Sequence, residues 1–121
     1  SVTLNYSAVA NHVAATTGAT TIWVVPTNTL TLNGGAFSGN TTNTGGGGTI
    51  TGTMTTVGPP SFVSPGSPYY DYHINLGSPL RDAATGSAMP VDMDNQPRTD
   101  GLPDIGADEY GSDLIFRDGF Q

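Results

Sequence analysis

Cysteine and lysine are both absent from the 121-residue sequence, and the first 70 residues contain no Asp, Glu, Lys or Arg. Without cysteine, the fold has neither a disulfide framework nor a thiolate metal site. The cations are Arg81, Arg98 and Arg117, and the formal net charge is −7. Nucleic acids and anionic membrane surfaces are bound through clustered cations, so we expect neither class of partner. No apolar run approaches the roughly 20 residues that cross a bilayer, and we expect no membrane insertion.

The charges that are present lie in the second half of the chain. All 10 acidic residues fall between Asp71 and Asp118. A composition shift this sharp marks a change of structural role within one domain. We expect an uncharged region rich in Gly and Thr over residues 1–70, and an acidic C-terminal region over residues 71–121.

Alternating apolar residues predict short β-strands in the uncharged region. The pattern Val-Thr-Leu-Asn at residues 2–5 returns 28 residues later as Leu-Thr-Leu-Asn. In the run 49–55, strict alternation places Ile50 and Met54 on one face and threonines on the other. The run 22–25 is apolar at every position, which is typical of a strand covered on both sides or buried at an interface.

A repeat of this length, with short strands and Asn-containing corners, describes one coil of a β-solenoid. Asn11 and Asn40 stand where strands should turn, and asparagine tolerates the left-handed conformation that such corners require. Coils must stack to bury their apolar faces, so residues 1–70 would be the coils and residues 71–121 their cap and tail. We expect a single buried stripe formed by Leu4, Leu32, Ile50 and Ile105. A small antiparallel sandwich with Gly-rich hairpins is the alternative.

Three segments of the acidic region form an ordered series of motifs. They are Gly-Ser-Pro-Leu-Arg-Asp-Ala (77–83), Asp-Met-Asp-Asn-Gln-Pro-Arg (92–98) and Pro-Asp-Ile-Gly-Ala-Asp-Glu-Tyr (103–110). In this order they resemble the closing block of bacterial right-handed parallel β-helix proteins of the choice-of-anchor Q type. The resemblance implies an all-β fold, namely a short right-handed parallel β-helix (β-solenoid) with a loop-rich C-terminal capping block. It also implies an extracellular or surface-displayed bacterial protein.

The acidic region contains candidate ligands for Ca²⁺, a cation that takes several oxygen ligands from a loop. The candidates are Asp92, Asp94 and Asp100, because the sequence Asp-x-Asp-Asn that starts at Asp92 begins like a calcium loop. The glycine and the distal glutamate of such a loop are missing. The alternative is therefore that these carboxylates cap turns, and that the protein needs no cofactor.

Asp82, Arg98 and Asp104 are the candidates for a structural ion pair, because a desolvated carboxylate needs a cationic partner. The two histidines, His12 and His73, have no Ser, Cys or metal-type neighbour at a catalytic or ligand spacing. We therefore interpret both histidines as surface or packing residues.

The expected function follows from the solenoid. A stack of few coils has an uncovered edge at its first strand, where Val2, Leu4 and Tyr6 lie, and a further strand adds readily to such an edge. We expect a non-enzymatic structural or adhesive module that is displayed on the cell surface or self-assembles, as in a filament. Its partners would be other copies of itself, upstream coils of the same protein, or glycans. The alternative is the C-terminal tail of a carbohydrate-active β-helix, although residues 1–70 lack the carboxylates and bases that such catalysis needs.

Overall fold

The computed structural model describes residues 1–13, 20–98 and 102–111. Its contacts divide the chain into two compact units, Ser1–Pro59 and Pro60–Gln121. Strands, turns and bends make up the described residues, which include no helix. No candidate membrane-spanning helix is therefore found among them. The all-β class predicted from the sequence is confirmed.

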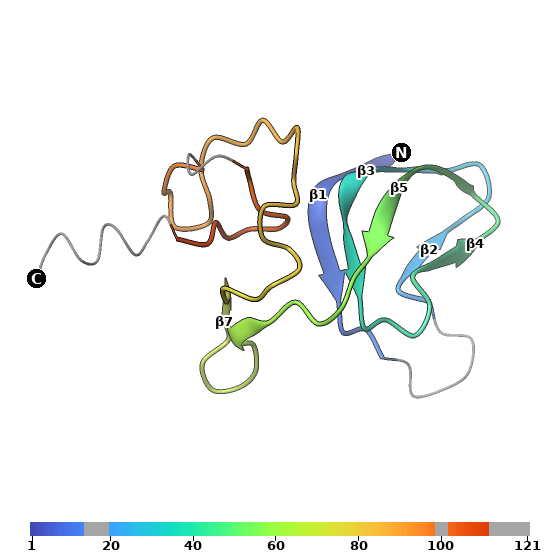
Figure 1. The fold of residues 1–121 in the computed structure, drawn as a ribbon. Helices are drawn as coiled ribbons and strands as arrows, with labels where there is room; N and C mark the ends of the chain where they lie inside the picture. The colour runs from blue at the N-terminus through green and yellow to red at the C-terminus, as the bar shows by residue number, and fades with distance from the viewer. Residues whose placement is uncertain (14–19, 99–101, 112–121) are drawn as a thin grey trace, which may run out of the picture. The chain divides into compact units, whose positions relative to one another are not determined.

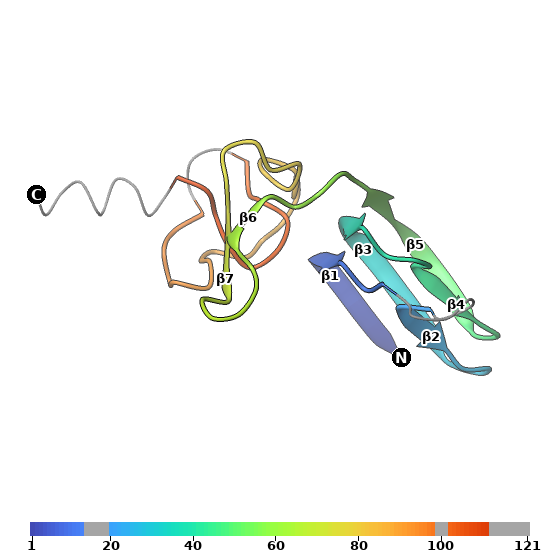
Figure 2. The ribbon, with the colours of Figure 1, turned by 90° about the horizontal axis from the view of Figure 1, so that it is seen from below.

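Two parallel sheets make up the first unit. One sheet contains β1 (Val2–Ala10), β3 (Thr29–Ser38) and β5 (Thr49–Thr56), in that order. The other pairs β2 (Ile22–Val24) with β4 (Thr44–Gly46). The chain passes from one sheet to the other at every strand, so neighbours within each sheet are separated by a strand of the other (Figures 1 and 2). The parallel pairing excludes the antiparallel sandwich for this unit.

The 28-residue repeat in the sequence corresponds to the register in which β1 pairs with β3. Val2 lies opposite Leu30, and the pairing continues at the same spacing to Ala10 opposite Ser38, apart from Tyr6. The aligned asparagines are bonded to each other, since the Asn33 side-chain amide donates to Asn5 Oδ1 at 2.9 Å. Like side chains therefore stack on like side chains, and this fixes the register more firmly than the apolar pattern alone.

The core of the first unit lies between its two sheets. Val24, Leu30, Leu32 and Phe37 are buried, and four half-buried side chains pack against them: Leu4, Val9, Ile22 and Met54. Burying a side chain of this size stabilises the fold by about 1.5–3 kcal/mol.

Strand β2 is not covered on both sides within the single chain, so one of the two predictions for it is wrong. Trp23 and Val25 are exposed and only Val24 is buried. Burial of the strand at an interface stays a prediction. The segment alternates like its neighbours, with one face on the core.

The corners of the first unit use asparagine in two ways. Asn11 has a φ of 62°, the left-handed conformation expected of it. Asn40 acts through its side chain, which donates to the Val9 carbonyl at 2.9 Å and accepts from the His12 N–H at 3.0 Å.

Within β5, Gly52 has a φ of 74°, and a Cβ there would collide with the Leu32 carbonyl of the adjacent strand. Only glycine fits that position without strain.

Turns dominate the second unit. In its described part, strands β6 (Phe62–Ser64) and β7 (Asp71–Ile74) pair antiparallel. Its buried apolar residues are Ile74, Leu80, Ala84 and Ile105. The predicted buried stripe is wrong at Ile50, which is 39 % exposed. Leu4 and Leu32 both pack in the core of the first unit, and Ile105 is buried within the second unit.

Candidate functional sites

The first candidate site is the free edge of the three-stranded sheet. Among the described residues, β1 is hydrogen-bonded to β3 and carries no strand on its other side. The three residues predicted for this edge play different parts. Val2 is 59 % exposed, Leu4 packs on the core, and Tyr6 lies against Gly34, where an added Cβ would be 2.8 Å from the Tyr6 ring. Val2 is thus the apolar side chain that the edge presents to solvent.

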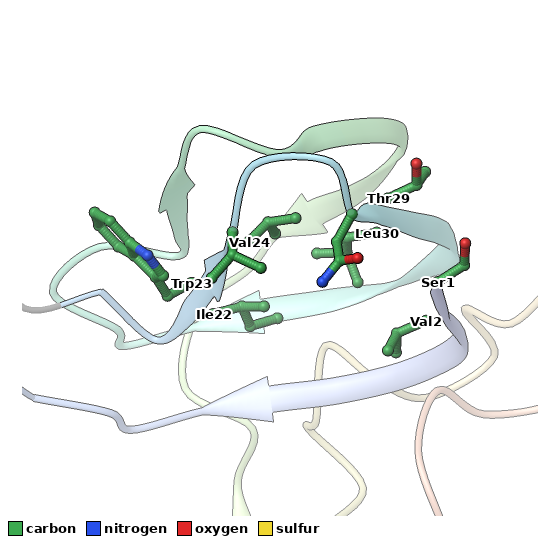
Figure 3. A pocket seen from close by; sticks show the side chains of 9 residues that line it. Ser1, Val2, Ile22, Trp23, Val24, Thr29 and Leu30 are labelled. Carbon is green, nitrogen blue, oxygen red and sulfur yellow. The ribbon is translucent and has the colours of Figure 1, made fainter.

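An apolar pocket opens beside Val2 (Figure 3). Its apolar lining comes from both sheets: Val2, Ile22, Trp23, Val24, Val25 and Leu30. Trp23 is 65 % exposed, although tryptophan is among the side chains that gain most from burial. No charged side chain lines the pocket. The apolar lining next to a free sheet edge makes this pocket a candidate interaction site.

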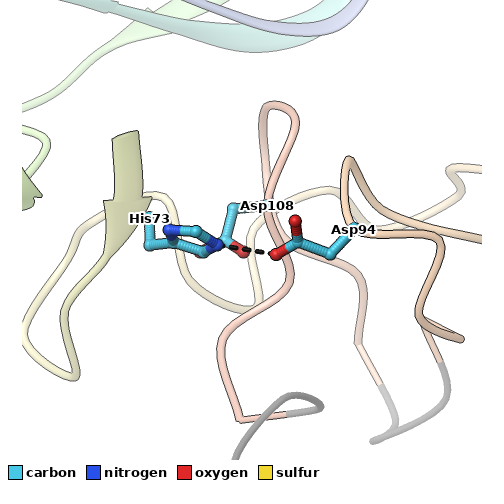
Figure 4. A group of neighbouring side chains, drawn as sticks. All are labelled: His73, Asp94 and Asp108. Atoms are coloured by element: carbon cyan, nitrogen blue, oxygen red, sulfur yellow. Dashed lines mark hydrogen bonds and ion pairs between the residues drawn. The ribbon is translucent and has the colours of Figure 1, made fainter. Parts of the chain in front are cut away.

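The second candidate site surrounds His73 in the second unit. Asp71 and His73 both belong to β7, and His73 Nδ1 lies 2.6 Å from Asp71 Oδ1. The other ring nitrogen, Nε2, lies 2.6 Å from Asp94 Oδ2, which comes from the turn after Val91 (Figure 4). A third carboxylate, that of Asp108, is buried and accepts the Ile74 N–H at 2.8 Å. One ligand atom each from His73, Asp94 and Asp108 lies within 4.8 Å of the others.

The carboxylates change the titration of the imidazole. Hydrogen bonds to Asp94 and then to Asp71 raise the pKa of His73 to about 9. The side-chain hydrogen bond between His73 and Asp71 is also the main reason why the pKa of Asp71 is lowered. At neutral pH, His73 is therefore an imidazolium that donates from both ring nitrogens and links β7 to the turn containing Asp94. Sequence reasoning treated His73 as a surface or packing residue and missed this role.

Arg98 is the centre of a buried polar network in the same unit. Its guanidinium donates to the backbone carbonyls of Asp104 and Gly106, each at 2.8 Å, and lies 3.4 Å from Glu109 Oε2. The ion-paired side chains of Arg98 and Glu109 are only 4 % and 0 % exposed. Glu109 was not among the predicted partners of Arg98.

The two carboxylates predicted to pair with Arg98 also make other contacts. Asp104 accepts the backbone N–H groups of Asp82 and Tyr110, at 2.5 and 2.6 Å, and meets Arg98 through its carbonyl oxygen. The Asp82 carboxylate lies 3.6 Å from Arg81 in a half-exposed ion pair.

Two of the predicted calcium ligands, Asp92 and Asp94, have different partners. Asp92 Oδ1 accepts the N–H groups of Asp94 and Gln96, at 2.9 and 2.8 Å, and so caps its own turn. Asp94 instead faces His73. Asp100 lies outside the described residues. The cluster of metal-binding type in the described residues is His73, Asp94 and Asp108, and the sequence contains no spacing signal for it because its members come from three separate segments.

Comparison with known proteins gives no match: no family model, no curated protein and no solved structure is similar to the chain. The resemblance of the acidic motifs to the choice-of-anchor Q closing block therefore stays a prediction.

Proposed function

We propose that the chain is a non-enzymatic structural module of the bacterial cell exterior, in which a short right-handed parallel β-helix is extended by strand addition at β1. The added strand comes from a second copy of the chain. The observation that carries the proposal is the free edge of β1 beside an exposed apolar pocket.

The strand arrangement of the first unit supports the β-helix. Successive strands alternate between two parallel sheets, and β1 pairs with β3 at one spacing. The pairing of β3 with β5 keeps one spacing as far as Asn33, after which the register shifts by one residue. An asparagine ladder and the stacked apolar side chains of Leu4 and Leu32 join the same two levels. Right-handedness is the rule for parallel connections of this type, because right-twisted strands pack back onto the sheet only in that sense.

The two outer strands of the sheet support a second copy as the occupant. β5 pairs with β3 in the same direction as β1, so its outer side and that of β1 are complementary. In a head-to-tail stack, Ile50 of one copy would lie over Val2 of the next, as Ile50 already lies opposite Leu30. Both side chains are exposed in the single chain, at 39 % and 59 %. A head-to-tail contact of this kind leaves a free edge at each end and builds a filament.

A charged residue on the edge tests the proposal, since lysine on an outer strand blocks pairing with another chain. We expect the wild-type chain to sediment as a concentration-dependent series of oligomers, and Val2→Lys to sediment as a monomer. Val63→Lys is the matched control, because Val63 is a similarly exposed valine (51 %) in the second unit. It should assemble like the wild type.

Two results would contradict this function. If the wild-type chain stays monomeric at high concentration, a second copy does not pair with the edge of β1. Upstream coils of the same protein would then be the partner of that edge. Oligomers that Val2→Lys leaves intact would place the contact elsewhere. Negative-stain microscopy of the same samples separates filaments from closed oligomers.

A further inference from the structure

The His73 cluster has the chemical composition of a metal site. It offers one imidazole nitrogen and two carboxylate oxygens, from β7, from the turn containing Asp94 and from the segment ending at Tyr110. We infer that His73, Asp94 and Asp108 bind a divalent transition-metal ion of the Zn²⁺ class. This inference concerns the second unit and is independent of the proposed function.

The surroundings of His73 are those of a metal ligand. Asp71 holds the Nδ1 side of the ring at 2.6 Å, which leaves Nε2 turned toward Asp94 and Asp108 (Figure 4). A carboxylate on the far nitrogen is the usual partner of a metal-bound histidine, because it orients the ring and makes it a better donor. Asp108 is oriented in turn by the Ile74 N–H at 2.8 Å.

The local charge also favours a divalent cation. Three carboxylates, those of Asp71, Asp94 and Asp108, surround one imidazole, so the group carries a negative charge even when His73 is protonated. The chain contains no lysine. A bound divalent ion would neutralise charges that repel one another at this distance.

The donor set decides which class of metal fits. Ca²⁺ takes oxygen ligands almost exclusively, whereas a mixed imidazole and carboxylate set suits zinc and its neighbours in the first transition row. Two ligand atoms on a tetrahedral Zn²⁺ lie about 3.3 Å apart, given metal–ligand bonds of about 2.0 Å. The three donor atoms already lie within 4.8 Å of one another. The ion would replace the proton that Nε2 shares with Asp94, and water would complete its coordination.

Calorimetry and thermal melting of the full chain with Zn²⁺, after dialysis against EDTA, test the inference. We expect one Zn²⁺ per chain and a melting temperature several degrees higher in Zn²⁺. Asp94→Asn and Asp108→Asn should each weaken binding by at least about tenfold, because changing a residue that only orients a metal ligand already costs about 10–100-fold. The Asp108→Asn side chain keeps an oxygen that can accept the Ile74 N–H, so this variant removes the charge and retains the hydrogen bond. Asp82→Asn is the control, since it removes a carboxylate of the same unit outside the cluster, and it should bind like the wild type.

Cobalt supplies a second measurement that does not depend on stability. Co²⁺ bound at this site should give visible absorption bands that disappear in His73→Gln. The inference is overturned if Zn²⁺ produces neither heat nor a melting shift in the wild type, or if Asp94→Asn and Asp108→Asn bind as tightly as the wild type. Tighter binding of Ca²⁺ than of Zn²⁺ would overturn the assignment of His73 as a ligand.

Discussion

At the scale of single residues, the pair formed by Arg98 and Glu109 differs from the other ion pairs because both side chains are excluded from water. Removing one member of a buried pair leaves the other charge without compensation, which costs about 3–5 kcal/mol. We expect Glu109→Gln to lower the free energy of unfolding by this amount in urea titrations. Asp82→Asn removes the half-exposed partner of Arg81 and should cost less than about 1 kcal/mol. Equal costs for the two variants would contradict this account of Arg98.

His73 makes the stability of the metal-free protein depend on pH, and the direction of the change follows from its pKa. Its pKa is raised from 6.5 to about 9 in the folded state, so the folded chain binds the proton more tightly than the unfolded chain. The resulting stabilisation is complete below pH 6.5 and is lost as the pH rises through about 9. At the acid end, the lowered pKa of Asp71 makes its own contribution disappear as the pH falls below 3.8.

Urea unfolding in EDTA over a pH series measures this effect. The stability difference between the wild type and His73→Gln should be constant at weakly acidic pH and shrink toward pH 9. His12→Gln, which removes the exposed imidazole of the first unit, is the control. A difference that grows as the pH rises would show that His73 is not held as an imidazolium.

At the scale of strands, Gly52 shows how closely β5 approaches β3. A side chain there must adopt a left-handed φ and also meet the Leu32 carbonyl. Strained conformations of this kind cost about 1–3 kcal/mol, so we expect Gly52→Ala to lower the free energy of unfolding by at least that amount. Gly58 has open space around its Cα, and Gly58→Ala should stay within about 0.5 kcal/mol of the wild type. Circular dichroism in urea compares the two, and a Gly52→Ala variant as stable as Gly58→Ala would refute the close approach.

The strands of the first unit were the most predictable part of the fold. Alternation within each run and the returning Leu-Thr-Leu-Asn pattern are local signals, and they predicted β1, β3 and the register between them. The exposure of Ile50 and Trp23 could not be predicted, because it depends on which neighbouring element covers each side chain. In the second unit, His73 meets Asp94 across 21 residues through turns that follow no period. The partners of His73 therefore could not be predicted from the sequence, although the acidic motifs indicated the region in which Asp94 and Asp108 lie.

At the scale of the whole molecule, charge is confined to one unit, and this predicts how assembly responds to salt. Residues 1–59 are uncharged apart from His12 and the N-terminus, so no ion pair joins the proposed edges, whereas the whole chain carries a net charge of −7. Copies that approach one another repel. Raising NaCl from about 0.1 to about 1 M shortens the Debye length from about 10 Å to about 3 Å and should strengthen association. Light scattering at fixed protein concentration checks this prediction. If raising the salt concentration instead dissociates the assembly, charged groups must take part in the contact.

The connections that lead from the first sheet to the second differ in length, since residues 11–21 join β1 to β2 whereas residues 39–43 join β3 to β4. Both sheets nevertheless keep their pairing, with Val2 opposite Leu30 and Ile22 opposite Thr44. The pairing of equivalent residues therefore does not require connections of equal length. A foreign peptide inserted into the longer connection should leave the pairing of β1 with β3 intact, provided that Asn11 and His12 keep their backbone hydrogen bonds to Ser38 and Thr41.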